Sequence, residues 1–197
     1  DALRRAGAWD AYNVTEDADL GLRLARAGYR TGVVESLTYE EASAQYPNWL
    51  RQRARWLKGF MQTWLVHMRD PAMITRELGA VGFWVLQSCT AGIFGSALFH
   101  PLLLLLTIAQ FAILPHPSPG ASPLLIALGG LNLAVFVLGY GVAMIAANQA
   151  LRRQGMMGWW FTLATMPFYW LLMSAAAWLA LWQLIFSPHT WNKTEHG

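Results

Sequence analysis

Two polar clusters in the first third of the chain have residue types that suit the binding of a phosphorylated sugar. The first is Thr15-Glu16-Asp17, and the second is Gln52-Arg53-Ala54-Arg55-Trp56, about 35 residues later. On a helix Gln52, Arg55 and Trp56 fall at positions i, i+3 and i+4, so they share one face. A guanidinium matches phosphate oxygens bidentately, and an indole offers a flat apolar platform on which a sugar ring can lie.

Each cluster also has a plainer interpretation. Acidic residues in the first turn of a helix more often only stabilise that end of the helix. A helix rich in Arg and Trp beside a membrane is more often an anchor. The pairing of the two clusters, their order, and the apolar sequence that follows them favour the functional interpretation.

The helices and strands that position these clusters can be predicted from residues that favour the start or the end of a helix. Thr15 is a suitable N-cap, Arg23 and Arg26 occupy the expected last turn, and Gly28 suits the position after a helix end. Residues 29–34 are short and β-branched, which predicts a strand. A helix followed by a strand is typical of the end of an α/β domain.

A second helix is predicted from about Tyr46 to about His67, with Pro47 and Asn48 as its start signal. It mixes basic side chains with Trp and Leu, which is the composition of a helix lying in a membrane interface. The alternative is an amphipathic helix that packs on its own domain.

Charge divides the 197-residue chain into two parts. Only 13% of the residues are charged, about half of the roughly 25% usual in soluble domains. Eleven basic and ten acidic residues lie at or before Glu77, whereas Arg152 and Arg153 are the only charged residues from Leu78 to Asn192. The second part is therefore predicted to lie in lipid. The single cysteine, Cys89, excludes an intrachain disulfide and a cysteine-based zinc site, and the modest basic surplus gives a nucleic-acid partner little support.

Three apolar blocks follow. Residues 81–114 are too long for one span and too short for two, which predicts an interfacial or re-entrant helix over 83–99 and a span from Pro101 or slightly earlier. Residues 115–123 are predicted to form an external loop, and 124–147 one span. Residues 159–186 predict an interfacial entry and a further span, and Arg152 and Arg153 mark the cytoplasmic side.

With its two motifs in this order, the chain resembles the processive family-2 glycosyltransferases, such as the cellulose, chitin, hyaluronan and curdlan synthases. Those enzymes carry a TED motif, then a Q-x-x-R-W motif, then membrane helices. Residues 7–10 and 13–14 before the first motif, and residues 191–197 at the end, are also similar to the family. The resemblance covers essentially the whole chain.

The resemblance implies the α/β end of a GT-A-type domain joined to a helical transmembrane region, with helix predominating. Residues 1–45 would complete the cytoplasmic transferase domain, and 46–78 would form an interfacial region. Residues 79–187 would hold about three spans with interfacial or re-entrant helices, followed by a polar tail over 188–197. The protein would lie in the cell (inner) membrane as a multi-pass enzyme, and we favour a cytoplasmic C-terminus.

The resemblance also implies an inverting hexosyltransferase that passes a sugar from a UDP-sugar to a growing β-linked polysaccharide. Asp17 would be the general base and Glu16 a supporting neighbour. Arg55, with Gln52 and Arg53, would hold the pyrophosphate, and Trp56 would stack under the acceptor sugar. The polymer would leave through the membrane helices, and accessory export subunits are candidate partners.

The family binds Mg²⁺ or Mn²⁺ through aspartates that precede these motifs, so we expect no metal ligand in this chain. We interpret the chain as a fragment and expect residues 1–197 alone to bind UDP-sugar poorly and not to turn over. One alternative is a non-processive family-2 transferase acting on a lipid or short acceptor. A less favoured one is a non-enzymatic membrane transporter or scaffold.

Three further polar residues have competing interpretations. Lys58 and Lys193 could touch phosphate or polymer, but we expect solvent or lipid headgroups around them. His100, beside Pro101 in an apolar block, is either functional or the mark of a kink. The sugar, its linkage and the oligomeric state are not predicted by the sequence.

Overall fold

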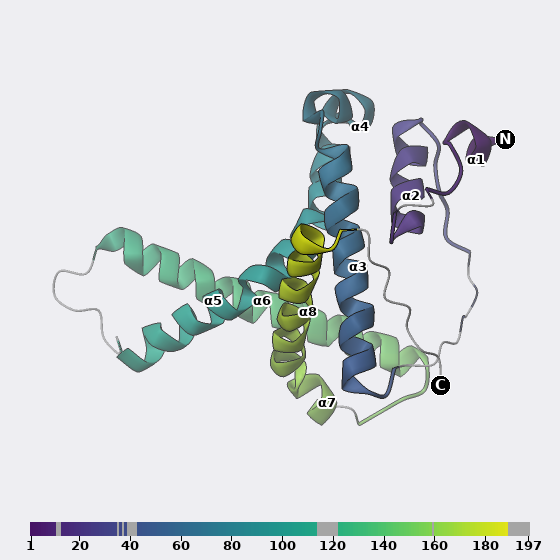
Figure 1. Cartoon of the computed structure of the whole chain (residues 1–197). Coiled ribbons are helices and arrows are strands. Elements are labelled where there is room, and N and C mark those ends of the chain that lie inside the picture. The colour runs from purple at the N-terminus through teal and green to yellow at the C-terminus, as the bar shows by residue number, and fades with distance from the viewer. Residues whose placement is uncertain are drawn as a thin grey trace. The chain divides into compact units, whose positions relative to one another are not determined.

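A computed structural model describes residues 1–10, 13–34, 36, 38, 43–113, 122–158 and 160–188. Over these ranges the secondary structure is entirely helical (Figure 1). The helices are α1 (Ala2–Arg5), α2 (Glu16–Arg26), α3 (Tyr46–His67), α4 (Pro71–Cys89), α5 (Ala91–Ile113), α6 (Pro123–Arg153), α7 (Trp160–Ala164) and α8 (Met166–Phe186). The chain divides into two compact units, which we call unit 1 (Asp1–Leu98 and Ala175–Gly197) and unit 2 (Phe99–Ser174). The prediction of a predominantly helical chain is confirmed.

The predicted strand over residues 29–34 is wrong. The structure leaves these residues without regular structure, and Val33 and Val34 are 98% and 80% exposed. A β-branched run has the propensity for a strand, but a strand is stabilised by hydrogen bonds to a neighbouring strand. No such neighbour exists among the described residues, so the α/β end of a GT-A-type domain is not seen in them.

Helix α2 begins and ends where its predicted N-cap residue and the glycine after it indicate. Thr15 is the N-cap residue, and Glu16, Asp17 and Asp19 fill the first turn. Gly28 follows the helix with φ of +80°, a left-handed conformation that glycine adopts without strain. The side chain of Thr15 does not cap the helix but turns toward α3, which contributes to the site described below.

Helix α3 is the central helix of unit 1 and has the predicted bounds. Pro47 lies in its first turn, and the apolar side chains of Ala54, Leu57 and Met61 are at most 3% exposed. These positions are spaced i, i+3 and i+7, which makes one buried stripe along the helix. The polar residues of the second motif lie on the face of α3 away from this buried stripe.

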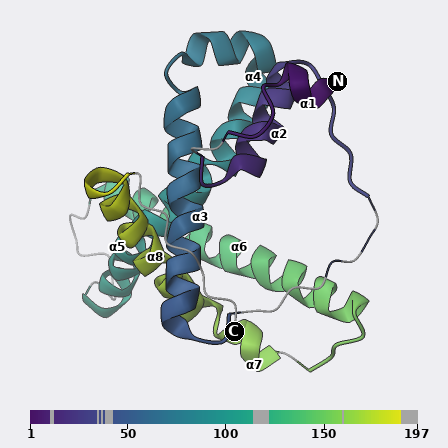
Figure 2. The ribbon, with the colours of Figure 1, turned by 45° about the vertical axis from the view of Figure 1, so that its right-hand side comes forward.

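Helix α4 bends at Gly79, whose φ of 70° and ψ of 170° interrupt the helical backbone. Asp70 caps its start by accepting a hydrogen bond of 2.8 Å from the Met73 amide. After the bend the helix returns alongside α3, where Trp64 Nε1 donates to Gln87 Oε1 at 2.8 Å (Figure 2). The bend therefore lets a single helical segment cover the end of α3.

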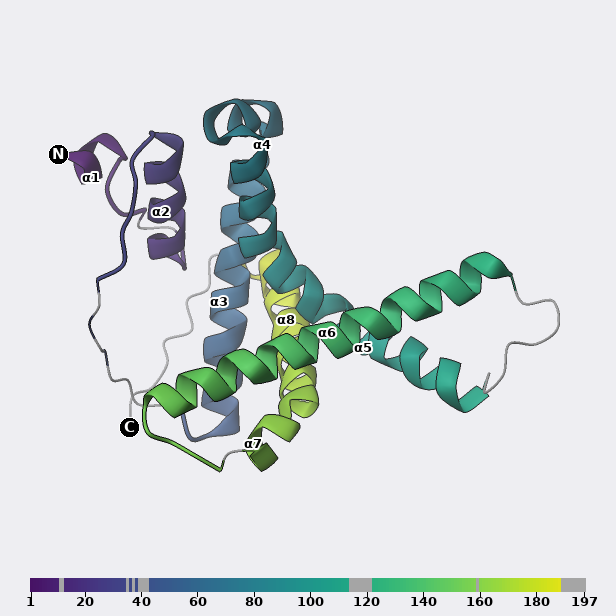
Figure 3. The ribbon, with the colours of Figure 1, turned by 180° about the vertical axis from the view of Figure 1, so that it is seen from behind.

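Helices α5, α6 and α8 are each long and apolar enough to cross a membrane. Their most apolar stretches cover Ala91–Ala112, Pro123–Arg153 and Met166–Phe186. The single span predicted over 124–147 lies within α6, which Figure 3 shows as one uninterrupted helix. The short entry helix and the span predicted over 159–186 correspond to α7 and α8.

The first apolar block is divided differently from the prediction. We expected a break just before Pro101, but α5 continues through Pro101, and the break lies at Thr90. Thr90 Oγ1 donates to the Leu86 carbonyl at 2.7 Å, which satisfies a carbonyl at the end of α4. The predicted external loop lies largely outside the described residues, as does the tail from residue 189.

Unit 2 joins α5 and α6 through two polar contacts. Asn132 Nδ2 donates to Thr107 Oγ1 at 2.7 Å and to the Leu103 carbonyl at 3.2 Å. In the second contact, His100 Nε2 on α5 lies 3.0 Å from the Tyr140 hydroxyl oxygen on α6. His100 therefore takes part in helix pairing.

Candidate active site

The first motif opens helix α2 in unit 1. The Asp17 carboxylate is exposed, and its Oδ1 accepts a hydrogen bond of 2.8 Å from the Ala18 amide. Glu16 is half-buried beside it. Both carboxylates lie in the first turn of α2, at the positively polarised end of the helix.

The residues around this motif are packed against α3. Thr15 is buried, and a Cβ atom added to Gly59 would lie 2.4 Å from Thr15 Cγ2. One turn further along α3, Thr63 Oγ1 accepts a hydrogen bond of 2.9 Å from Asn13 Nδ2. Two consecutive turns of α3 therefore fix the start of α2 at close range.

The second motif occupies the preceding turn of the same helix. Gln52, Arg55 and Trp56 are half-buried, and Gly59 follows Arg55 by one turn, a rise of roughly 6 Å. The contact at Gly59 consequently brings the TED segment to the neighbouring turn of the Q-x-x-R-W helix. A common face for Gln52, Arg55 and Trp56 follows from the helical backbone of α3.

Arg53 lies against two tryptophans. Its Cζ is 4.4 Å from the ring centroid of Trp56 and 5.8 Å from that of Trp49. These are cation–π distances, which fix the guanidinium and one face of the Trp56 indole together. The buried Nε of Arg53 has no hydrogen-bond partner within the described part of the chain.

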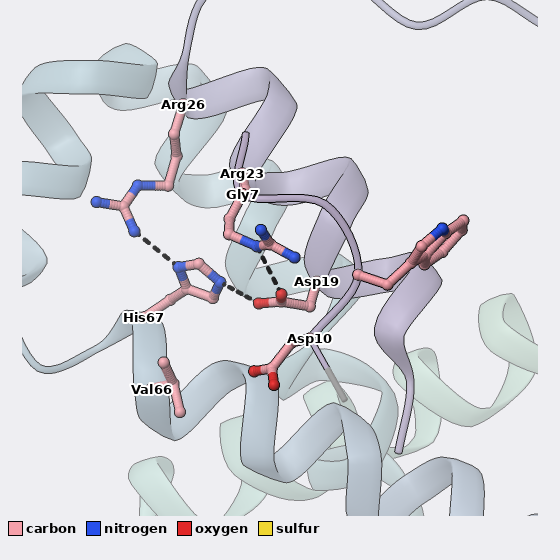
Figure 4. Close-up of a pocket in the computed structure, with 8 residues that line it drawn as sticks. Gly7, Asp10, Asp19, Arg23, Arg26, Val66 and His67 are labelled. Atoms are coloured by element: carbon pink, nitrogen blue, oxygen red, sulfur yellow. Dashed lines mark hydrogen bonds and ion pairs between the residues drawn. The ribbon is translucent and has the colours of Figure 1, made fainter. Parts of the chain in front are cut away.

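A third group of side chains, which the sequence interpretation did not identify as a site, joins α2 to the end of α3 (Figure 4). His67 is 4% exposed, and its Nε2 lies 2.9 Å from Asp19 Oδ1. The other Asp19 oxygen accepts from Arg23 Nε at 2.7 Å, and Arg26 Nη1 lies 2.8 Å from His67 Nδ1. These residues line an open hollow of about 590 Å³, together with Gly7, Trp9, Asp10 and Val66.

One signal in the sequence could have identified His67. Arg55, Gly59, Thr63 and His67 recur every four residues, so they follow one another along adjacent turns of a helix. The helical periodicity that places Gln52, Arg55 and Trp56 on one face thus extends to His67 at the end of the helix. Arg23 and Arg26 were interpreted only as cations near a helix end, where they also bind Asp19 and His67.

The prediction for Lys58 is wrong. We expected solvent or headgroups, but this side chain is 1% exposed, and its Nζ donates to the Ser187 carbonyl at 2.9 Å. Burial lowers the pKa of Lys58 because desolvation disfavours the charged form. The carbonyl lies just after the last residue of α8, where the helix dipole favours a cation. Lys193 lies outside the described residues.

The resemblance to family-2 glycosyltransferases implies a divalent metal, whose fit depends on the acidic and histidine side chains present. Over the described ranges, no three His, Cys, Asp or Glu side chains are grouped as metal ligands. Both oxygens of Asp19 are already engaged by Arg23 and His67. The described residues therefore do not fit a resident divalent cation.

The comparisons with known proteins identify a family for the chain. The model of a family described as glycosyl transferase family group 2 matches residues 1–191. The comparisons with curated proteins and with solved structures gave no significant match. The matched range includes both polar motifs and all three long apolar helices.

Proposed function

Because the chain belongs to family group 2 of the glycosyltransferases, we propose that it transfers a sugar from a UDP-sugar to the end of a growing β-linked polysaccharide. The observation that carries the proposal is the contact between Thr15 and Gly59, which joins the TED segment to the Q-x-x-R-W helix. The general activity of sugar transfer follows from the family. The donor, the acceptor and the residue roles below are our proposal.

Asp17 acts as the general base. The acceptor hydroxyl oxygen attacks the anomeric carbon from the face opposite the leaving group, and its proton passes to the Asp17 carboxylate. The bond between the anomeric carbon and the phosphate oxygen breaks, UDP leaves, and the configuration inverts. The exposure of Asp17 at a helix start supports this role, because an exposed carboxylate is accessible to the acceptor hydroxyl. Glu16 assists as a neighbouring carboxylate.

Arg55 and Gln52 bind the pyrophosphate of the donor. Negative charge grows on the leaving UDP as the glycosidic bond breaks, so a fixed guanidinium stabilises the transition state more than the ground state. Arg53 contributes from the edge of this group. Because the Arg53 guanidinium stacks on Trp56, Arg53 also orients the Trp56 indole.

Trp56 carries the acceptor sugar. An indole has two faces, and the Arg53 guanidinium covers one of them. The terminal sugar of the acceptor stacks on the opposite face, which brings its hydroxyl toward Asp17 and reduces the entropic cost of the reaction.

The long apolar helices hold the enzyme in the bilayer and form the exit path of the product. Arg152 and Arg153, at the end of α6, mark the cytoplasmic side of a multi-pass inner-membrane protein. Residues 1–45 complete the transferase domain in this proposal, 46–78 form an interfacial region, 79–187 the membrane region and 188–197 a polar tail.

The test uses full-length protein in lipid with radiolabelled UDP-glucose and UDP-N-acetylglucosamine, and it records transfer and product length. Asp17→Asn is expected to abolish transfer while UDP still binds, because the amide is nearly isosteric but cannot take the proton. Normal transfer by this variant would overturn the assignment. If the products are extended by a single sugar, the role of Asp17 as base stands, but the enzyme is a non-processive transferase and not a polymerase.

A further inference from the structure

Buried side chains of α2 and α3 fix the helix that carries Asp17. Asp19 is two residues after Asp17 in the same helical turn, and it is 4% exposed. Its two oxygens bind His67 on α3 and Arg23 on α2. A displacement of Asp19 would therefore move Asp17 with it.

The hydrogen bonds determine the state of the His67 ring. A guanidinium can only donate, so Nδ1 of His67 must accept from Arg26 and carries no proton. The remaining proton is on Nε2, which donates it to Asp19. His67 is thus a neutral imidazole with one donor and one acceptor, each directed at a different residue of α2.

The same group reaches two other segments of unit 1. Arg23 donates to the Ala6 carbonyl and, at 2.7 Å, to the Ala8 carbonyl. Ala8 has φ of 54°, a left-handed conformation that is uncommon outside glycine and needs support from its surroundings. Arg26 Nε binds Glu77 of α4 at 2.6 Å. His67 therefore lies at the centre of contacts among the first loop, α2, α3 and α4.

We propose that His67 is a positioning residue for sugar transfer, which holds Asp17 at its working distance through the His67–Asp19 hydrogen bond. This inference rests on the proposed function of Asp17. His67 itself touches neither donor nor acceptor. Its two hydrogen bonds fix the orientation of α2 on α3, and a general base works only within hydrogen-bond reach of the hydroxyl that it deprotonates.

The alternative is a purely structural role, in which His67 only stabilises the fold. The two roles differ in how they change the kinetic constants. Loss of folded protein lowers the amount of active enzyme and its UDP-binding capacity equally, and a conservative replacement has no special effect. A misplaced base lowers kcat of the folded enzyme but leaves donor binding nearly unchanged, because the donor is held by Arg55 and Gln52 in our proposal.

The experiment compares three variants of the full-length protein in lipid vesicles. His67→Leu removes both hydrogen bonds, whereas His67→Gln retains one donor and one acceptor at the end of a neutral side chain. Leu65→Ala is the matched control, since Leu65 lies on the same turn but is 49% exposed. For each variant, kcat and the donor KM are measured with the radiolabelled UDP-sugar that supports transfer, and UDP binding by calorimetry counts the folded sites.

For His67→Leu we expect kcat per UDP-binding site to fall on the order of 10- to 100-fold, the scale of a misplacement near 1 Å. Its donor KM should stay within about two-fold, because the ground-state contacts to the donor persist. His67→Gln should restore most of kcat, and Leu65→Ala should resemble the wild type. Unchanged kcat in His67→Leu, or a loss in His67→Gln as large as that in His67→Leu, would overturn the proposal.

Asp19→Asn alters the same His67–Asp19 contact from the α2 side, and it replaces His67→Leu in the experiment if that variant does not fold. It should also lower kcat selectively, and combining both changes should cost little more than the larger single change, because both break one interaction. Additive losses would contradict the proposal. Asp17→Asn separates the two hypotheses: if it is inactive while His67→Leu is normal, only the positioning role fails. An active Asp17→Asn rejects the proposed role of Asp17 as the general base, on which the positioning role rests.

Discussion

In unit 1 buried ionisable side chains join α2 to α3, whereas in unit 2 neutral polar pairs join α5 to α6. Asp19 and His67 have side-chain exposures of only 6% and 3%, and Arg23 completes their group. In unit 2 the corresponding contacts are Asn132 with Thr107 and His100 with Tyr140. The difference follows the charge boundary of the sequence, since unit 2 contains only two formal charges, both at the end of α6.

The physical reason is the cost of charge in each medium. A buried ion pair near water can be completed by several hydrogen bonds, and Asp19 receives them from two partners. A charge inside lipid lacks that compensation, so membrane helices use amides, hydroxyls and close packing instead. Helix α6, which is long and apolar enough to cross a membrane, buries none of its residues within the protein. Positioning by charge is thus confined to unit 1, which also contains the candidate site.

The strongest test of this comparison is the contact at Gly59. Gly59→Ala would place a methyl group 2.4 Å from Thr15 Cγ2, and α3 and α2 would have to separate. We expect unit 1 to lose about 1–3 kcal/mol of stability, the usual cost of overpacking, and transfer to fall. Urea titration in detergent, monitored through Trp fluorescence, measures the loss.

Gly21→Ala is the matched control for that change. Gly21 is also inside a helix of unit 1, but a Cβ atom there would meet nothing within 4 Å. Alanine should stabilise α2 by roughly 0.5–1 kcal/mol because glycine loses more conformational freedom on folding. Equal effects of the two substitutions would show that close approach at Gly59 is not what joins the helices.

Lys58 provides a test based on pH. Its pKa in the folded protein is lowered from the ordinary value of 10.5 by burial, so the unfolded chain binds more protons just below that value. Stability of unit 1 should therefore rise with pH in the alkaline window that ends near the ordinary pKa. Lys58→Met should lack this rise in urea titrations between pH 7 and pH 11, a range chosen to bracket roughly the ordinary pKa. An identical pH dependence in both proteins would contradict a buried ammonium.

In unit 2 the comparable test is the contact between Asn132 and Thr107. A double-mutant cycle with Asn132→Leu and Thr107→Val should give a coupling near 0.6 kcal/mol, the average for polar pairs between membrane helices. Proteolysis of the protein in bilayers measures it. A coupling of several kcal/mol would mean that polar side-chain contacts stabilise helix pairing in unit 2 as strongly as they do in unit 1.

The sequence predicted the elements of both units better than their contacts. Helices α2 and α3 have the predicted bounds because Gly28 and Pro47 are local signals that act without tertiary context. The strand over 29–34 was wrong because strands depend on a partner elsewhere in the chain. The role of Lys58 in packing was missed for the same reason, since its carbonyl partner lies 129 residues away.

The candidate site was predicted only in part from the sequence. The residue types of the two motifs and the shared face of Gln52, Arg55 and Trp56 follow from helical periodicity. The joining of these motifs through Gly59 does not, because glycine carries no chemical signal for close packing. His67 was also missed: its four-residue spacing places it on one face of α3, but its partner Asp19 is known only from the fold. The assigned roles of Asp17 and Arg55 remain predictions.

The smallest expected effect concerns the outer edge of the His67 group. The ion pair of Arg26 and Glu77 is more exposed, with side-chain exposures of 20% and 32%. The hydrogen bond from Arg26 holds the pKa of Glu77 below its ordinary value of 4.5, so its stabilising contribution is present above that value. It should be lost as the pH falls through the lowered pKa, and Glu77→Gln should remove this dependence.

The effect of Glu77→Gln at neutral pH should be smaller than that of any substitution above and should shrink further in high salt, because water and ions screen an exposed pair. Urea titrations at low and high sodium chloride concentration measure this difference. A loss as large as that of His67→Leu would show that the whole charged group acts as one unit. A negligible loss of stability would show that the buried pair of Asp19 and His67, with side-chain exposures of 6% and 3%, acts without the outer ion pair.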